Sequence, residues 1–139
     1  MKSLTLISRN MKNLILLVMC FFSSVINSQS QEKKSPELEW IISFKNNHVV
    51  FECAKGCNYS YLSFNADRKV ILNENTTVNL EKNPEERNDS NFLVQYSKSG
   101  NVIHLEGIKG VAWENITLLK DLNLKYCIDQ TGLIKKITT

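Results

Sequence analysis

The chain has 139 residues, a formal net charge of +3 and four cysteines. All three excess positive charges belong to Lys2, Arg9 and Lys12, in an N-terminal segment that holds no acidic residue. The remainder is formally neutral and has no cluster of cations. Because a nucleic-acid binder needs clustered cations to displace counterions, composition argues against that class of protein.

The N-terminal segment has the pattern of an export signal. Its positive residues precede an apolar run at residues 14–22, and small and polar residues follow. The run is too short to span a bilayer about 30 Å thick. We therefore predict a signal peptide over residues 1–28, starting at Met1 or Met11 and cleaved after Ser28 or Ser30. The protein would be secreted or periplasmic, with no membrane span once the signal is removed.

Residues 29–36 are polar and charged, and we expect a disordered lead-in there. Alternating apolar and polar residues then predict strands around residues 38–45, 49–53, 62–64 and 69–73. Asn46-Asn47 and Lys55-Gly56 predict the first two turns, since asparagine and glycine tolerate positive φ. Residues 81–90 are charged and contain Pro84, so we expect an exposed linker between two halves of the domain.

The second half repeats the plan of the first. Residues 51–64 align without a gap with residues 105–118, and the register extends back to Leu38 and Phe92. Beyond this block a short gap pairs Ile71 with Ile128. Within residues 51–64 three identical residues recur, with Glu52, Lys55 and Gly56 matched by Glu106, Lys109 and Gly110. This self-similarity predicts an internal duplication with halves at residues 38–75 and 92–129.

The last strands complete the predicted architecture. Alternation from Leu122 to Ile128 predicts a full strand, and residues 133–137 a short edge strand. Each half would then be a four-stranded antiparallel meander with one apolar face, which is marginal in water alone. Packing the two faces together gives a small sandwich or a closed barrel. We predict one all-β domain over residues 37–139, and we expect no helix.

Three cysteines remain after signal removal, and two pairings are open. Cys53 and Cys57 are both absent from the second half, where Gly107 and Val111 stand, which favours a local disulfide between them. Loop entropy instead favours a Cys57–Cys127 bridge, at about 4 kcal/mol against about 2 kcal/mol. With the local pair formed, Cys127 could link two copies of the chain.

The sequence contains few groups of side chains that could support catalysis or bind a metal. We predict no catalytic residue, no metal site and no cofactor. Two cysteines four residues apart lack the further ligands that zinc needs. His48 and His104 have no third group to orient a nucleophile. The recurring Glu52 and Glu106 could in principle flank a glycosidic bond, but ion pairs with Lys55 and Lys109 explain them more simply. We therefore expect a protein that is not an enzyme.

Three aromatic residues are candidates for ligand contact. Tyr59 and Trp113 follow the two Lys-Gly turns, where an aromatic side chain either plugs the core or stacks on a ligand; Tyr61 is predicted to face solvent. The function that fits best is a binding module for a protein or glycan. An inhibitor or immunity protein against an exported toxin or protease is the alternative, and a small carboxylate-based hydrolase is the weakest.

The pattern Cys53-x-x-Gly56-Cys57-x-aromatic, echoed by Gly110-x-x-Trp113, resembles small exported proteins common in Bacteroidetes. The resemblance covers most of the chain after the signal, and its motifs are structural. It implies export and the duplicated fold, and no catalytic residue carries over from it. Tyr59 departs from the tryptophan expected there, and Cys127 lacks the nearby partner that the pattern implies.

Overall fold

A computed structural model describes residues 36–138. The predicted signal peptide at residues 1–28, both cleavage points and nearly all of the lead-in at 29–36 lie outside the described residues. Within residues 36–138, no helix is long and apolar enough to cross a membrane.

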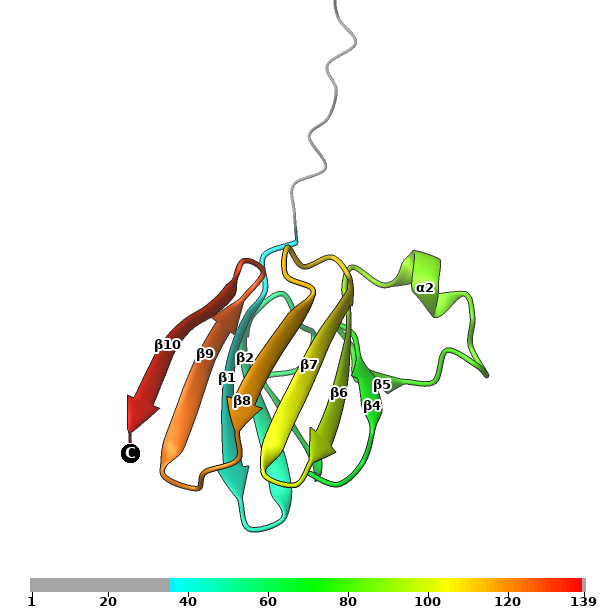
Figure 1. Cartoon of the computed structure of the whole chain (residues 1–139). Helices are drawn as coiled ribbons and strands as arrows, with labels where there is room; N and C mark the ends of the chain where they lie inside the picture. Colours follow the sequence, from blue (N-terminus) through cyan, green and yellow to red (C-terminus); the bar gives the residue numbers. More distant parts are fainter. Residues whose placement is uncertain (1–35, 139) are drawn as a thin grey trace, which may run out of the picture. The chain divides into compact units, whose positions relative to one another are not determined.

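The described chain is all-β and forms two antiparallel five-stranded sheets (Figure 1). Sheet A has the strand order β10 (Gly132–Thr138), β9 (Leu124–Asp129), β1 (Glu39–Lys45), β2 (His48–Lys55) and β3 (Tyr61–Asn65). Sheet B has the order β5 (Thr77–Val78), β4 (Val70–Leu72), β6 (Leu93–Ser99), β7 (Val102–Lys109) and β8 (Asn115–Leu119). Both sheets are open, so the predicted closed barrel is wrong.

The prediction of two meanders is also wrong, because the halves exchange strands. After β3 the chain leaves sheet A, and β4 pairs with β6 of sheet B. After β8 it leaves sheet B, and β9 pairs with β1 of sheet A. Alternation fixes which residues of a strand face the core, but it does not name the neighbouring strand. β4 and β5, which follow β3 in the chain, therefore complete sheet B, and β9 and β10, which follow β8, complete sheet A.

A tyrosine hydroxyl holds each crossing segment. Tyr96 of β6 donates to the Ala66 carbonyl at 2.9 Å, just after β3. Tyr126 of β9 donates to the Leu119 carbonyl at 2.8 Å, at the end of β8. Burial raises the pKa of both phenols. Each exchange is thus secured by a polar contact as well as by strand pairing.

The two halves have matching hydrogen-bond registers. In the β1–β2 ladder Glu39 pairs with Lys55, the register shifts, and Trp40 pairs with Cys53. The β6–β7 ladder pairs the positions 54 residues later and has its register shift at the matching place, with Leu93 opposite Lys109 and Val94 opposite Gly107. In the exchanged strands Ile71 faces Gln95 and Cys127 faces Ile41. Ile71 therefore corresponds to Cys127, and its predicted match with Ile128 is wrong by one residue.

One hydrophobic core takes side chains from both sheets. Trp40 of β1 meets Phe51 of sheet A and Phe92, just before β6, edge-on at centroid distances of 5.2 and 5.3 Å. Phe64 of β3 meets Tyr96 of β6 at 5.1 Å. Such edge-to-face pairs add to the hydrophobic gain of burying the rings. In β1 the core residues Trp40, Ile42 and Phe44 follow the alternation from which this strand was predicted.

Two connecting segments, the linker and the segment before β9, differ from the sequence prediction. The linker at residues 81–90 is mainly exposed as predicted, but it contains a short helix, α2 (Glu86–Asp89), where none was expected. Leu122 was expected within the last full strand, yet it lies before β9 and is 57 % exposed. There Asp121 accepts hydrogen bonds from the Asn123 and Leu124 amides, and this local turn competes with the extended strand.

Candidate functional site

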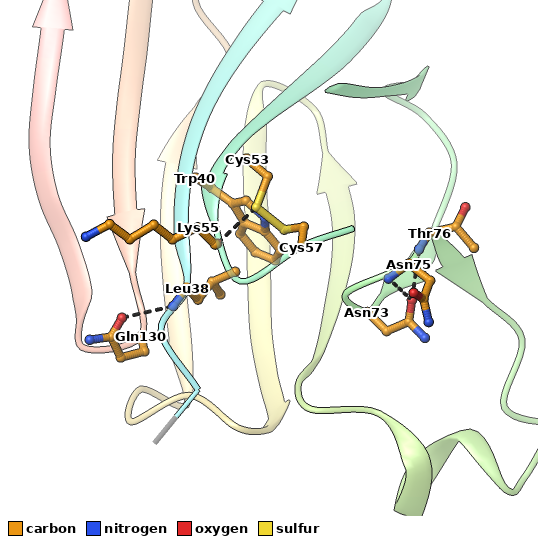
Figure 2. Close-up of a disulfide and its surroundings, with 9 residues drawn as sticks. All are labelled: Leu38, Trp40, Cys53, Lys55, Cys57, Asn73, Asn75, Thr76 and Gln130. Carbon is orange, nitrogen blue, oxygen red and sulfur yellow. Dashed lines mark hydrogen bonds between the residues drawn. A yellow bond between two sulfur atoms is a disulfide. The ribbon is translucent and has the colours of Figure 1, made fainter. Parts of the chain in front are cut away.

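The disulfide end of the domain is the region around Cys53 and Cys57, at the end of β2. The Cys53 and Cys57 sulfurs are 2.05 Å apart, at the distance of a disulfide (Figure 2). The indole N–H of Trp40 donates to the Cys57 sulfur at 3.3 Å, which joins the pair to the core. The preferred local pairing is present, whereas the alternative Cys57–Cys127 bridge is not. Cys127 is free and half-buried in β9, between β1 and β10.

Replacing both cysteines of the pair, Cys53→Ser with Cys57→Ser, should lower the free energy of unfolding by about 2 kcal/mol, because the crosslink closes only a short loop. Cys127→Ser is the matched control and should change it by about 0.5 kcal/mol or less. Urea unfolding followed by circular dichroism measures both. Equal midpoints for the two variants would show that the disulfide does not constrain the chain.

The three candidate aromatic side chains occupy different environments. Tyr59 is half-buried next to the disulfide end, whereas the Trp113 indole is 9 % exposed and lies in the core. The Trp113 N–H donates to the Asp129 carbonyl at 2.9 Å. Tyr61, at the start of the edge strand β3, is 54 % exposed. Of the three, Tyr61 alone presents most of its ring to solvent.

Burial of the Tyr59 hydroxyl raises its pKa from 10.0 to about 12, while the neighbouring Trp40 indole opposes part of this rise. Above pH 10 the unfolded chain releases this proton and the folded chain keeps it. Stability should therefore fall as pH rises from 10 toward 12. Denaturant midpoints across this range should fall less steeply for Tyr59→Phe than for the unaltered protein. An identical pH dependence in both would contradict the burial of this hydroxyl.

The recurring glutamates and lysines do not form the predicted ion pairs. Lys55 lies 3.9 Å from Glu39, and Lys109 donates to the Arg87 and Asn88 carbonyls at 2.9 and 2.8 Å. The register explains the first contact, because Lys55 lies opposite Glu39 in the β1–β2 ladder, whereas Lys109 lies opposite Leu93, which has no carboxylate. Lys109 instead fixes the backbone of α2.

Glu52 and Glu106 occupy equivalent positions on different sheets. Glu52 lies in β2 of sheet A, and Glu106 lies in β7 of sheet B. Glu106 accepts a hydrogen bond of 2.8 Å from the Gln95 amide. His48 and His104 are both exposed. Among residues 36–138, no group of three or more histidine, cysteine, aspartate or glutamate side chains is placed to hold a metal ion.

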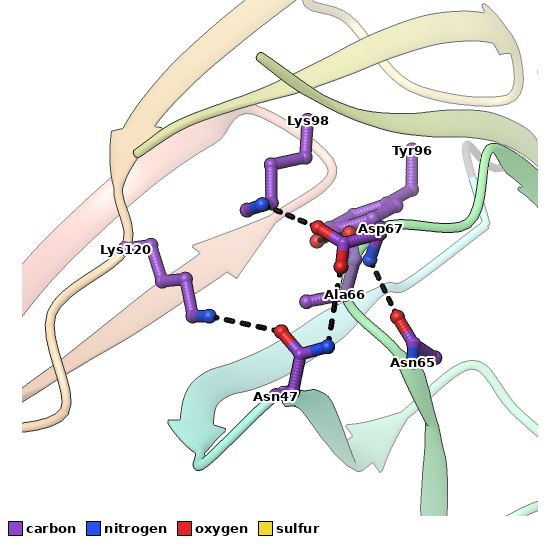
Figure 3. A network of polar contacts seen from close by, with 7 residues as sticks. All are labelled: Asn47, Asn65, Ala66, Asp67, Tyr96, Lys98 and Lys120. Atoms are coloured by element: carbon purple, nitrogen blue, oxygen red, sulfur yellow. Dashed lines mark hydrogen bonds and ion pairs between the residues drawn. The ribbon is translucent and has the colours of Figure 1, made fainter. Parts of the chain in front are cut away.

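A polar network lies at the segment that carries the chain from β3 to β4 (Figure 3). Asp67 accepts hydrogen bonds from Lys98 and, at 3.1 Å, from the Asn47 amide. Lys120 donates to the Asn47 side-chain oxygen at 3.4 Å. The hydrogen bonds from Lys98 and Asn47 lower the pKa of the exposed Asp67 carboxyl. The network joins the first turn to residues of both crossing segments.

A second polar cluster fixes the start of the linker. Asn73 is buried and accepts hydrogen bonds from the Asn75 and Thr76 amides, both at 2.9 Å (Figure 2). Its amide group donates to Glu86 of α2 at 3.0 Å. The buried Glu74 carboxylate accepts the Asn91 backbone N–H at 3.0 Å. Both ends of the linker are therefore held against sheet B.

A groove of about 750 Å³ lies on the outer face of sheet B. Its floor contains Ile71, Gln95 and Glu106, which face one another across the β4–β6 and β6–β7 ladders. These residues alternate with the core residues of the same strands, so they point away from the core. Residues 79–81, which follow β5, form part of the lining, as does Arg87 of α2.

The shortness of β5 explains why chain from the linker can line this face. In sheet A the outermost strand β10 has seven residues, whereas β5 in the corresponding place of sheet B has two. The chain beyond β5 leaves the ladder and continues toward α2. The groove therefore lies on sheet B beside the short strand β5, and residues from both sides of the linker line it.

Sequence reasoning identified Glu106 but missed the groove itself. Arg68, Lys69 and Arg87 line it together with Ile108, and none of these four residues was a candidate. The three cationic residues do not form a cluster in the sequence, which is formally neutral after the signal. Only the strand exchange brings residues 68–71 beside residues 95 and 106. The charged linker predicted at residues 81–90 was the available signal in the sequence, since Glu81 and Arg87 of this linker line the groove. Comparisons of the chain with models of protein families, with curated protein sequences and with solved structures found no match.

Proposed function

We propose that the chain is an exported, non-enzymatic β domain whose groove on sheet B binds a protein or glycan partner. The observation that carries this proposal is the groove of about 750 Å³, which combines cationic and aliphatic side chains over the outer face of sheet B. Binding sites of this kind are concave, largely formed in advance and supplied with a few oriented polar groups. The groove lies on sheet B, which strands of both halves build, beside the two-residue strand β5, whereas the edge strand β10 of sheet A has seven residues.

The proposed architecture behind this site is a duplicated unit whose two sheets pack as a sandwich. Its support is the common offset of 54 residues between the two ladders, down to the position of the register shift. The aromatic contacts that join Trp40 to Phe92 and Phe64 to Tyr96 support packing of the two inner faces. Duplication would leave one of two equivalent sheets free to acquire a binding surface while the other preserved the fold.

A site-specific photo-cross-linker tests the proposed function. Ile108, in the groove and 37 % exposed, is replaced by a photoreactive residue, and Leu133 of β10, 48 % exposed, receives the same replacement as the matched control. Irradiation in the protein's own cell envelope should give a discrete, saturable product from position 108 and none from position 133. Absence of a product at both positions, or the same product from each, would contradict a binding role for the groove.

A further inference from the structure

The charged side chains of the groove are unevenly distributed. Arg68 and Lys69 stand where the crossing segment enters β4, and Arg87 extends from α2. Within residues 36–138, none of these three side chains has an ion-pair partner. The Lys109 ammonium donates to the Arg87 backbone carbonyl at 2.9 Å, so the backbone from which the Arg87 side chain extends is held in place.

The acidic side chains of the groove are fewer and one of them is engaged. Glu106 accepts the Gln95 amide on the floor of the groove, and Glu81 lies after β5. Three cationic groups therefore stand against two carboxylates. A ligand carboxylate placed beside Arg68, Lys69 or Arg87 gains a charge-assisted hydrogen bond, whereas one placed over Glu106 is repelled.

The apolar lining points to the class of ligand. Ile71, Val78, Leu80 and Ile108 are aliphatic, and no phenylalanine, tyrosine or tryptophan lines the groove. Sugar rings present flat C–H faces that pack best on aromatic rings, and this groove offers none. Aliphatic side chains of a peptide have no such requirement and can fill the space between the cations.

We propose that the groove binds an acidic peptide segment of a protein partner. Aliphatic side chains of the segment lie over Ile71 and Ile108, and its carboxylates pair with Arg68, Lys69 and Arg87. This inference rests on the proposed binding function and narrows its ligand from a protein or glycan to a peptide with separated acidic residues. Recognition of acidic motifs by arginine-containing clusters is a recurrent binding mode.

Fluorescence anisotropy tests the proposal with a labelled, capped peptide of alternating glutamate and leucine. The peptide should bind the purified protein, and Arg68→Glu or Arg87→Glu should each raise the Kd about tenfold or more. The matched control is Lys135→Glu with Lys136→Glu on β10, which changes exposed lysines outside the groove and should leave the Kd unchanged. An analogue with glutamine in place of glutamate should bind about tenfold more weakly or worse.

Three results would overturn the proposal: no binding of the peptide, equal binding of the glutamine analogue, or equal affinity in the groove and control variants. Displacement of the peptide by an oligogalacturonate, an acidic oligosaccharide, would instead identify a glycan site. If any of these occurs while position 108 still cross-links a partner, the binding function stands and only the assigned ligand class is wrong.

Discussion

Gly110→Ala should destabilise the protein by about 3 kcal/mol or more, and Gly56→Ala should do the same, because both residues combine a positive φ with a close backbone contact. The φ angles are +86° at Gly56 and +75° at Gly110. A Cβ atom at Gly56 would lie 2.0 Å from the Glu37 carbonyl oxygen, and one at Gly110 would lie 2.2 Å from that of Asn91. The obstructing atoms are backbone, so no side-chain rotation relieves the clash.

Gly100 provides a matched control for this prediction. It also has a positive φ, of +59°, but a Cβ atom there would meet nothing within 4 Å. Gly100→Ala should therefore carry only the conformational cost of about 1 kcal/mol. Thermal and urea unfolding followed by circular dichroism measure all three variants. If Gly110→Ala is no less stable than Gly100→Ala, the close approach of the Lys109-Gly110 turn to Asn91 and Phe92, just before β6, is wrong.

Trp40→Ala should cost about 3–5 kcal/mol, because it removes a large side chain that no solvent reaches. Trp40 contacts aromatic rings of both sheets and donates to the Cys57 sulfur. Domains of this size are stabilised by only about 5–15 kcal/mol, so a substantial part of the protein's stability should be lost. The free energy of unfolding in urea gives the value.

Leu119→Ala is the control for Trp40→Ala. Leu119 ends β8 and is 55 % exposed, so its truncation should change stability by about 0.5 kcal/mol or less. A loss at Leu119 comparable with that at Trp40 would mean that the core does not centre on the tryptophan. Retained stability in Trp40→Ala would have the same meaning.

The strands, the first turns and the local disulfide could be predicted because each leaves a short-range signal. Alternation marks an inward residue such as Phe51, and the joint absence of Cys53 and Cys57 from the second half marks a pair. Turns are also marked by residue type, because asparagine tolerates the positive φ that a tight turn requires, as at Asn46 with its φ of +53°. These features depend on neighbours a few residues away, which a pattern in the sequence reports directly.

The exchange of strands and the groove could not be predicted, because both depend on which distant segments meet. Ile71 has the same alternation whether β4 lies beside β3 or beside β6, and only the pairing with Gln95 places it on the groove floor. The helix α2 is a single turn held by its contacts to Asn73 and Lys109 rather than by its own sequence pattern. Arg87 becomes a candidate only once that turn is in place.

Cutting the linker tests the central claim, that each half completes the sheet of the other, most directly. A protease site is inserted between Lys82 and Asn83, both exposed, and the purified protein is cleaved. The described disulfide lies within the first half, so it does not bridge the cut. The two fragments should co-elute in size-exclusion chromatography at the volume of the uncut protein, and separate only when urea is added. Separation without denaturant would contradict the exchange of strands between the halves.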